Sequence, residues 1–265
     1  MQKKIIDSFN KAAKTYSSHD FLQRHVAQIL LDKLSCIKSK QKFILDVGCG
    51  TGFLANKLLA KHDVVALDAA IEMCYMSDIE NVVCANAASL PFCNNAFDLV
   101  VSNLMMQWLG DDLMSFLQES KRVVSTEGFV LFSTLGPNTL YEMQEVMAEV
   151  SSAEHVNSQL DMHIVGDLFI QAGFADVVMD RVMLTIEYKS FKHLLNDLRK
   201  TGANVILSQE KVKLNKKKLS QISDIYQNKY SSNGKIVASY EVVFAKAWGK
   251  SLPKNEVDVS SIKRG

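Results

Sequence analysis

Hydrophobic side chains recur at helical spacing in the first 34 residues and gather in short runs after residue 42. In the first part the apolar positions lie three or four residues apart within 5–16 and 21–34, which predicts two amphipathic helices. After residue 42 the apolar runs are short and bounded by Gly, Asp or Asn, and they lie at 43–47, 64–68, 82–85, 98–103 and 129–135. Short apolar runs of this kind are typical of strands buried on both faces of a sheet.

Helical segments separate these strands, for example residues 53–60 and 111–124. Alternation of strand and helix predicts βαβ units, a parallel sheet and right-handed crossovers. The sequence therefore belongs to the α/β class. Beyond this alternation we expect two more helices and then two strands, at 138–152, 165–172, 177–188 and 236–248.

Residues 189–234 are helical in pattern although they lie between two predicted strands, and we interpret them as an inserted helical cap. They carry ten Lys or Arg against three acidic residues, a net charge of +7 that leaves −6 for the rest of the chain. We therefore predict a single domain over 1–248. Its parts are the N-terminal helices (1–41), the core (42–188 and 235–248) and the cap (189–234), followed by a flexible polar tail (249–265).

Composition narrows the class of protein. The 265 residues are 48% hydrophobic and 22% charged, as in ordinary globular domains, and the net charge of +1 gives no overall attraction to nucleic acid or to an anionic membrane. The five cysteines form no CxxC pair and indicate reduced thiols in a cytosolic protein. No apolar run is long enough for a membrane span or a signal peptide. Nothing in the sequence indicates the oligomeric state.

The segment that follows the first predicted strand, Asp46-Val47-Gly48-Cys49-Gly50-Thr51-Gly52, is the most informative one. A dinucleotide fingerprint needs GxGxxG, so the GxGxG spacing disfavours a nicotinamide-dependent oxidoreductase. The acidic Asp46 would repel a pyrophosphate but suits a ligand with positive charge. S-adenosylmethionine, which carries an ammonium and a sulfonium, is such a ligand.

The next strand ends supply further polar groups at the same sheet edge, where ligands of open α/β folds bind. Asp68 ends the second strand and is placed to accept both ribose hydroxyls of the cofactor. Asn86 and Ala87 follow the third strand near the expected adenine position, and Asn103 follows the fourth, opposite the glycine turn. The predicted cofactor-binding residues are Asp46, Gly48, Gly50, Gly52, Asp68, Asn86, Ala87 and Asn103.

With these motifs the chain resembles the class I S-adenosylmethionine-dependent methyltransferases and, more narrowly, the malonyl-acyl carrier protein O-methyltransferases of biotin biosynthesis. The resemblance implies a Rossmann-like, mostly parallel seven-stranded sheet and methylation of the free malonyl carboxylate on acyl carrier protein. Asn86 departs from the usual acidic residue, and Ala69 from a common Ser. The likeness runs through FNKAAKTY (9–16), LDVGCGTG (45–52), SLPF (89–92), SNLMMQW (102–108), FSTLGPNTL (132–140), HVN (155–157), DLRKTGAN (197–204) and YEVVFAKAW (240–248).

A carboxylate is already ionised at neutral pH, so this reaction requires no general base and no metal. The predicted catalytic residues are Arg199, which can grip a carboxylate bidentately, Tyr16, which can close over the cofactor, and Gln107, which can line the acyl pocket. Each also has a plainer interpretation, as a solvated arginine, a packing tyrosine or a structural amide. His155 and Asn157 are candidates for hydrogen bonds across the cap.

The lysine-rich stretch 211–218 is either a solvated helix face or a docking surface for acidic acyl carrier protein. RNA binding is disfavoured, because the net charge is near zero and no aromatic residues interrupt the lysines. Two other functions stay open: a methyltransferase of the same fold with another small acceptor, such as a quinone precursor, and a catalytically silent carrier-binding protein.

Overall fold

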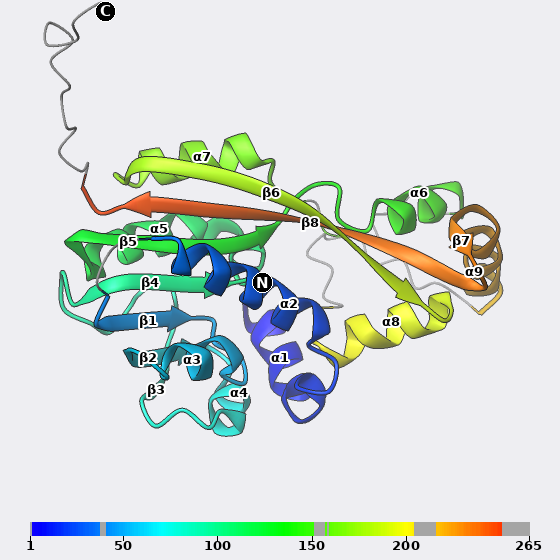
Figure 1. The fold of residues 1–265 in the computed structure, drawn as a ribbon. Helices are drawn as coiled ribbons and strands as arrows, with labels where there is room; N and C mark the ends of the chain where they lie inside the picture. Colours follow the sequence, from blue (N-terminus) through cyan, green and yellow to red (C-terminus); the bar gives the residue numbers. More distant parts are fainter. Residues whose placement is uncertain (1, 38–40, 151–156, 158, 204–215, 251–265) are drawn as a thin grey trace, which may run out of the picture.

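A single sheet forms the centre of the protein (Figure 1). The computed structural model describes residues 2–37, 41–150, 157, 159–203 and 216–250. The strands are β1 (Phe43–Val47), β2 (Asp63–Asp68), β3 (Val82–Cys84), β4 (Phe97–Asn103), β5 (Val124–Leu135), β6 (Ala175–Tyr188), β7 (Ser231–Ser232) and β8 (Lys235–Trp248). Their order is β3-β2-β1-β4-β5-β8-β6, with β7 paired to β8 beside this path.

Strands β1 to β5 are parallel, whereas β8 runs antiparallel to both β5 and β6. The α/β class and the mostly parallel seven-stranded sheet are thus confirmed, with the two-residue β7 as an addition. The chain moves from β1 outward to β3, and then crosses back to β4 on the other side of β1. Such a reversal leaves a crevice at the carboxyl ends of β1 and β4, which is where open α/β sheets bind ligands.

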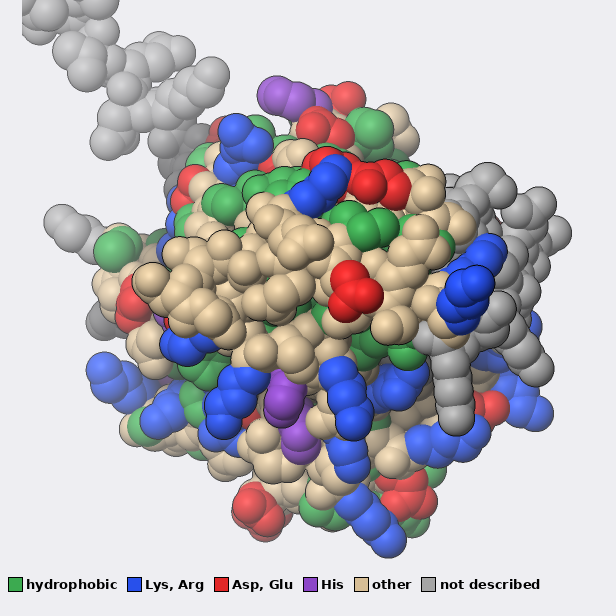
Figure 2. Space-filling model, turned by 90° about the vertical axis from the view of Figure 1, so that its right-hand side faces the viewer, with side chains coloured by type: hydrophobic (Ala, Val, Ile, Leu, Met, Phe, Trp, Pro, Cys, Tyr) green, Lys and Arg blue, Asp and Glu red, His purple; other side chains and the backbone are tan. Residues whose placement is uncertain are grey.

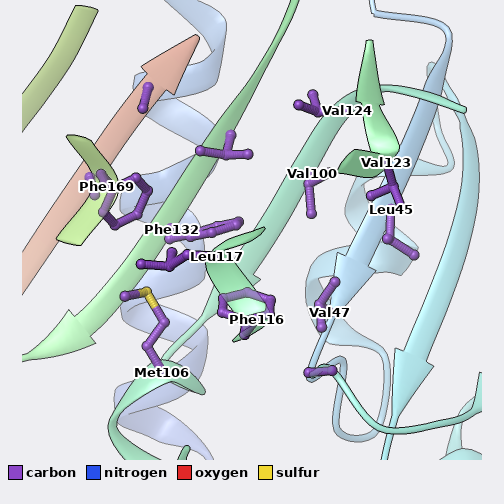
Figure 3. Packing of buried hydrophobic residues seen from close by; sticks show 14 of the residues in the cluster. Leu45, Val47, Val100, Met106, Phe116, Leu117, Val123, Val124, Phe132 and Phe169 are labelled. Carbon is purple, nitrogen blue, oxygen red and sulfur yellow. The ribbon is translucent and has the colours of Figure 1, made fainter. Parts of the chain in front are cut away.

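Both faces of the sheet are covered by helices. The helices are α1 (Gln2–Tyr16), α2 (Phe21–Ser35), α3 (Phe53–Leu58), α4 (Ile71–Met76), α5 (Leu113–Val123), α6 (Tyr141–Val150), α7 (Met162–Gln171), α8 (Phe191–Lys200) and α9 (Lys216–Tyr230), with short 3-10 helices η1 (Met106–Trp108) and η2 (Gly110–Asp112). Ile44 of β1 packs with α2 and α3 on one face. Leu45 and Val47 pack on the other face with Phe116 of α5 and Phe169 of α7 (Figure 3). Because neighbouring side chains on a strand point to opposite faces, a sheet covered twice requires the continuous apolar run seen in the sequence.

The cap is built on the far ends of β6 and β8, which extend beyond the other strands (Figure 1). Helices α6, α8 and α9 pack there around a separate core that includes Met143, Leu194, Tyr226 and Tyr240. The sequence division placed the segment of α6 with the main core, whereas the structure packs α6 against α9 and β8. Seen from this side, Lys and Arg side chains gather over the lower half of the molecule (Figure 2).

Among the described residues, no helix is long and apolar enough to cross a membrane. The same residues contain no group of three or more His, Cys, Asp or Glu that could hold a metal ion. The predicted tail falls almost wholly on residues 251–265, which lie outside the described part of the chain.

Candidate active site

The glycine turn leaves β1 and is held against the end of β2. The N–H groups of Gly48 and Cys49 both donate to the carbonyl of Leu67, at 2.7 and 3.0 Å. Gly48 has φ +76°, and a Cβ there would lie 2.4 Å from Cγ of Met105. Only glycine fits this position, since a side chain would be strained and would collide with the loop that follows β4.

Asp68 connects the same turn to the next helix. Its carboxylate accepts the N–H of Gly50 at 2.9 Å and the N–H of Ala70 at 2.8 Å. Burial raises the pKa of this carboxyl, while the backbone hydrogen bonds oppose the rise. A carboxylate oxygen can accept more than one hydrogen bond, so Asp68 retains capacity for the hydroxyls of a ligand.

Asp46 is a buried carboxylate without a counterion. Its side chain is 1% exposed, and neither oxygen has a hydrogen-bond partner among the described residues. Burial and the neighbouring charge of Asp68 raise the pKa of Asp46 to about 7, although the nearby backbone N–H of Ala55 opposes the rise. An unpaired buried carboxylate is costly, and a cationic ligand beside it would remove that cost.

A cavity opens over the ends of β1, β2 and β4, and the empty space in it, including the part open to solvent, is about 770 Å³. Its described wall is mostly apolar and includes no His, Lys or Arg. The wall consists of Gln2, Ile5, Ile6, Phe9, Tyr16, Gly48, Gly50, Leu67, Asp68, Ala69, Ala70, Met73, Asn86, Ala87, Asn103, Leu104, Met105, Trp108 and Leu109. A second, smaller cavity, with about 350 Å³ of empty space including the part open to solvent, shares Tyr16 with the first and includes Asp46 and Arg24 in its wall.

Helix α1 covers the larger cavity. The Phe9 ring packs edge-on against Trp108 of η1, with ring centres 5.5 Å apart. The N–H of Glu72 on α4 donates to Oδ1 of Asn10 at 3.0 Å, which fixes the outer side of α1. Tyr16 lines both cavities and lies beside Gly50. Burial and the nearby Asp20 and Asp68 raise the pKa of Tyr16 above its ordinary value, so its hydroxyl stays protonated.

Seven of the predicted site residues line the larger cavity, namely Tyr16, Gly48, Gly50, Asp68, Asn86, Ala87 and Asn103. Besides the glycine turn and Asp68, whose hydrogen bonds are given above, the two asparagines also have structural partners. Oδ1 of Asn86 accepts the N–H of Ala88 at 2.9 Å. Asn103 donates from Nδ2 to the carbonyl of Gln23 at 2.9 Å, which ties the end of β4 to α2.

The remaining predicted residues lie elsewhere. Asp46 lines only the smaller cavity. Gly52 precedes α3 with φ +87°, and a Cβ there would meet Ser77. Gln107 donates to the carbonyl of Leu104 at 2.7 Å and accepts from Thr134 at 3.2 Å, so it braces the turn after β4. Arg199 is exposed on α8, outside both described cavity walls.

Other predictions fall on residues that cannot be described. His155 and residues 211–215 lie outside the described part of the chain, as does the side chain of Lys216. Asn157 is half-buried. Lys217 and Lys218 stand at the start of α9.

The sequence reasoning missed the contribution of α1 to the apolar half of the cavity. Ile5, Ile6 and Phe9 of α1 all contribute to its wall. The apolar face of the first helix was visible in the sequence, but the pattern could not tell whether that face covers a core or a cavity. In chemical terms, the site offers a carboxylate for a cation, a carboxylate for hydroxyls and an apolar chamber.

The fold has clear counterparts among solved structures. A methyltransferase from Bacillus halodurans superposes with a TM-score of 0.60 at 17% identity, covering 85% of this chain and 99% of that one. Residues 45–132 match the methyltransferase domain family. The sheet, the glycine turn and the acidic strand ends therefore define a class I methyltransferase.

Two curated relatives narrow the class. The malonyl-[acyl-carrier protein] O-methyltransferase of Gallionella capsiferriformans is 36% identical over 98% of this chain and 95% of its own length. The corresponding protein of Halorhodospira halophila is 34% identical over 97% of this chain and 91% of its own. The chain belongs to the malonyl-[acyl-carrier protein] O-methyltransferase family.

Proposed function

We propose that this protein transfers the methyl group of S-adenosylmethionine to the free carboxylate of a malonyl group carried by acyl carrier protein, and that the resulting ester enters the route to biotin. The observation that carries the proposal is the full-length match to the family, joined to a cavity whose two ends suit the two reactants. The free thiols of all five cysteines support the cytosol as the compartment.

The residues at the glycine turn fit S-adenosylmethionine. Asp46, buried and unpaired, would lie toward the cofactor's ammonium, and Asp68 would accept the ribose hydroxyls. Asn86 and Ala87 would border the adenine, with one lone pair of the Asn86 carbonyl still available to its amino group. When bound, the cofactor supplies an electrophilic methyl group on a positively charged sulfur.

The protein's own contribution is to position and desolvate the acceptor. A malonyl carboxylate arrives ionised, so no side chain has to remove a proton. Ile5, Ile6, Phe9 and Trp108 surround the acceptor end with apolar groups, which exclude water from the reacting oxygen. Attack by a carboxylate on a sulfonium neutralises two charges, and an apolar wall whose described residues include no Lys or Arg favours such a step.

The predicted catalytic residues take different positions in this scheme. Tyr16, between the two cavities, would hold the cofactor in place against Gly50. Gln107 would hold the turn that carries Leu104 in place, and Leu104 in turn forms part of the cavity wall. Arg199 could reach the substrate only at the surface beside α1, and its grip on the malonyl carboxylate stays a prediction.

The test is incubation of the protein with methyl-labelled S-adenosylmethionine and malonyl-acyl carrier protein, followed by mass analysis of the carrier. A gain of one methyl group, removable by mild ester hydrolysis, is expected. A phenolic panel, including quinone precursors, serves as the comparison. Methylation of a phenol with none of the carrier would refute the proposal, and so would cofactor binding without any methyl transfer.

A further inference from the structure

Helices α1 and α8 lie side by side at the edge of the cavity. Oγ1 of Thr15 donates to the carbonyl of Lys200 at 3.2 Å, and Oγ of Ser8 donates to the carbonyl of Gly202 at 3.2 Å. A Cβ at Gly202 would lie 3.1 Å from the Phe9 ring, and Phe9 also lines the cavity. The side chain of Phe9 therefore lies between the end of α8 and the cavity.

The outer faces of these two helices are basic. On α1 the exposed positions recur at helical spacing opposite the apolar face, and on α8 they lie opposite Phe191 and Leu194. We name this surface the α1–α8 basic face. It consists of Lys3, Lys4, Lys11 and Lys14 from α1 and Lys192, His193, Arg199 and Lys200 from α8.

The net positive charge of the protein is concentrated on these two helices. The two helices carry seven Lys or Arg against Asp7 and Asp197, a net charge of +5 that leaves −4 for the rest of the chain. Asp197 is half-buried and accepts from the hydroxyl of Tyr188, so Asp7 is the only acidic residue of α1 or α8 exposed to solvent. Helices α1 and α8 lie in the lower part of the molecule in Figure 1, and Figure 2 shows Lys and Arg side chains gathered over the lower half of the side seen there.

We infer that the α1–α8 basic face is the docking surface for an acidic carrier protein, which delivers its acyl arm past Phe9 into the cavity. The inference rests on the proposed function for the identity of the carrier. Opposite charge on two surfaces speeds encounter and fixes orientation. A substrate held on a long arm requires its carrier to dock within reach of the chamber, and this face meets that condition.

Nucleic acid is the other polyanion that a basic face can bind. The α1–α8 basic face has no exposed Phe, Tyr or Trp side chain on which a base could stack. The acidic remainder of the chain also opposes binding to a long polyanion. An acidic protein of limited size fits this surface better.

The experiment compares two triple charge reversals with equal net charge. The first, Lys11→Glu, Lys14→Glu and Lys192→Glu, alters the α1–α8 basic face, where all three residues are exposed. The second, Lys42→Glu, Lys61→Glu and Lys250→Glu, alters exposed lysines near the starts of β1 and β2 and the end of β8, at the opposite edge of the sheet. Direct binding of unacylated carrier protein is measured at low and at physiological ionic strength, with melting temperature and cofactor affinity as folding controls.

The first triple should bind the carrier about tenfold or more weakly at low salt, with a flatter salt dependence, while the second matches the wild type. Equal losses in both triples, or in neither, would overturn the inference, as would wild-type binding of RNA with no binding of the carrier. Methyl transfer to malonyl-acyl carrier protein by the wild type separates the two ideas. Its absence, with carrier binding intact and confined to the α1–α8 basic face, counts against the proposed function alone.

Discussion

The carboxylate of Asp68 accepts the N–H of Gly50 at 2.9 Å, although the residues lie 18 positions apart in the chain. The bond couples the end of β2 to the turn after β1, so the group expected to bind ribose also shapes the loop expected to hold the rest of the cofactor. Removing Asp68 should therefore do more than remove one ligand contact.

We expect Asp68→Ala to weaken S-adenosylmethionine binding by about a hundredfold and to lower the melting temperature of the ligand-free protein. The ribose loses a charge-assisted acceptor, and the N–H groups of Gly50 and Ala70 lose theirs. Calorimetry and thermal melting measure the two effects. Asp63→Ala, at the exposed start of the same strand, is the control and should change neither. An Asp68→Ala protein with wild-type affinity would exclude Asp68 from the site.

Asp46 should give the ligand-free protein a pH-dependent stability. The pKa of its carboxyl rises from 3.8 to about 7 on folding, so the folded state binds a proton that the unfolded state has released. Stability must then fall as pH rises from about 4 to about 7, by up to about 4 kcal/mol. Urea unfolding of Asp46→Asn should show a smaller fall, to which Asp68, whose pKa burial also raises, still contributes. The variant should be more stable than wild type at pH 8 and similar at pH 4.

The same substitution should impair ligand binding. Asp46→Asn is expected to bind S-adenosylmethionine about tenfold or more weakly, because the ammonium loses its charged partner. In the wild type, affinity should rise as pH passes through about 7, where Asp46 ionises. Asp111→Asn, an exposed acid in η2, controls for net charge. A variant with unchanged affinity and unchanged pH dependence would show that the cation binds elsewhere.

Two substitutions of Tyr16 distinguish the contribution of its ring to cofactor positioning from that of its hydroxyl. Tyr16→Phe keeps the ring beside Gly50, and we expect cofactor affinity within about threefold of wild type. Tyr16→Ala joins the two cavities, and single-turnover methyl transfer should fall about tenfold or more, because the cofactor loses its positioning wall. Equal losses in both variants would assign the role to the hydroxyl instead.

Substitutions of Arg199 distinguish a role in docking the carrier at the surface from a direct contact with the malonyl carboxylate. Because it is exposed on α8 outside the described cavity walls, we expect Arg199→Ala to raise the KM for malonyl-acyl carrier protein severalfold and to leave the single-turnover rate at saturation unchanged. Arg199→Lys should restore most of the KM. A loss of the single-turnover rate in both variants would instead support a bidentate grip on the malonyl carboxylate.

The strands and their acidic ends were predictable, because each depends on a local signal. The run 43–47 followed by glycines places β1 and its turn, and an apolar run ending in Asp68 places the ribose-binding candidate. Helix α4 (Ile71–Met76) was not predicted, since six residues give too little periodicity. Strand β5 begins at Val124, five residues before the predicted start, because its first part pairs with β4 at Phe97.

Long-range arrangements were not predictable from spacing. Nothing local indicates that Phe9 of α1 meets Trp108, almost a hundred residues later, or that α6 packs with α9. That the Asp46 carboxylate has no hydrogen-bond partner among the described residues likewise depends on which groups surround it in the folded protein. For Arg199, the DLRKTGAN motif suggested contact with the malonyl carboxylate, but the motif could not show that the side chain is exposed to solvent in the folded protein.

Strand β8 lies between β5 and β6 and contributes to all three large cores, through Ala245 to one, Phe244 to the second and Tyr240 to the third. While a ribosome is still making the chain, none of these cores is complete before its own part of β8 has been added. Until then β5 and β6 present unpaired edges to the cell. Completion of the fold thus depends on the synthesis of β8, and a nascent chain stalled short of β8 would expose these edges to chaperones.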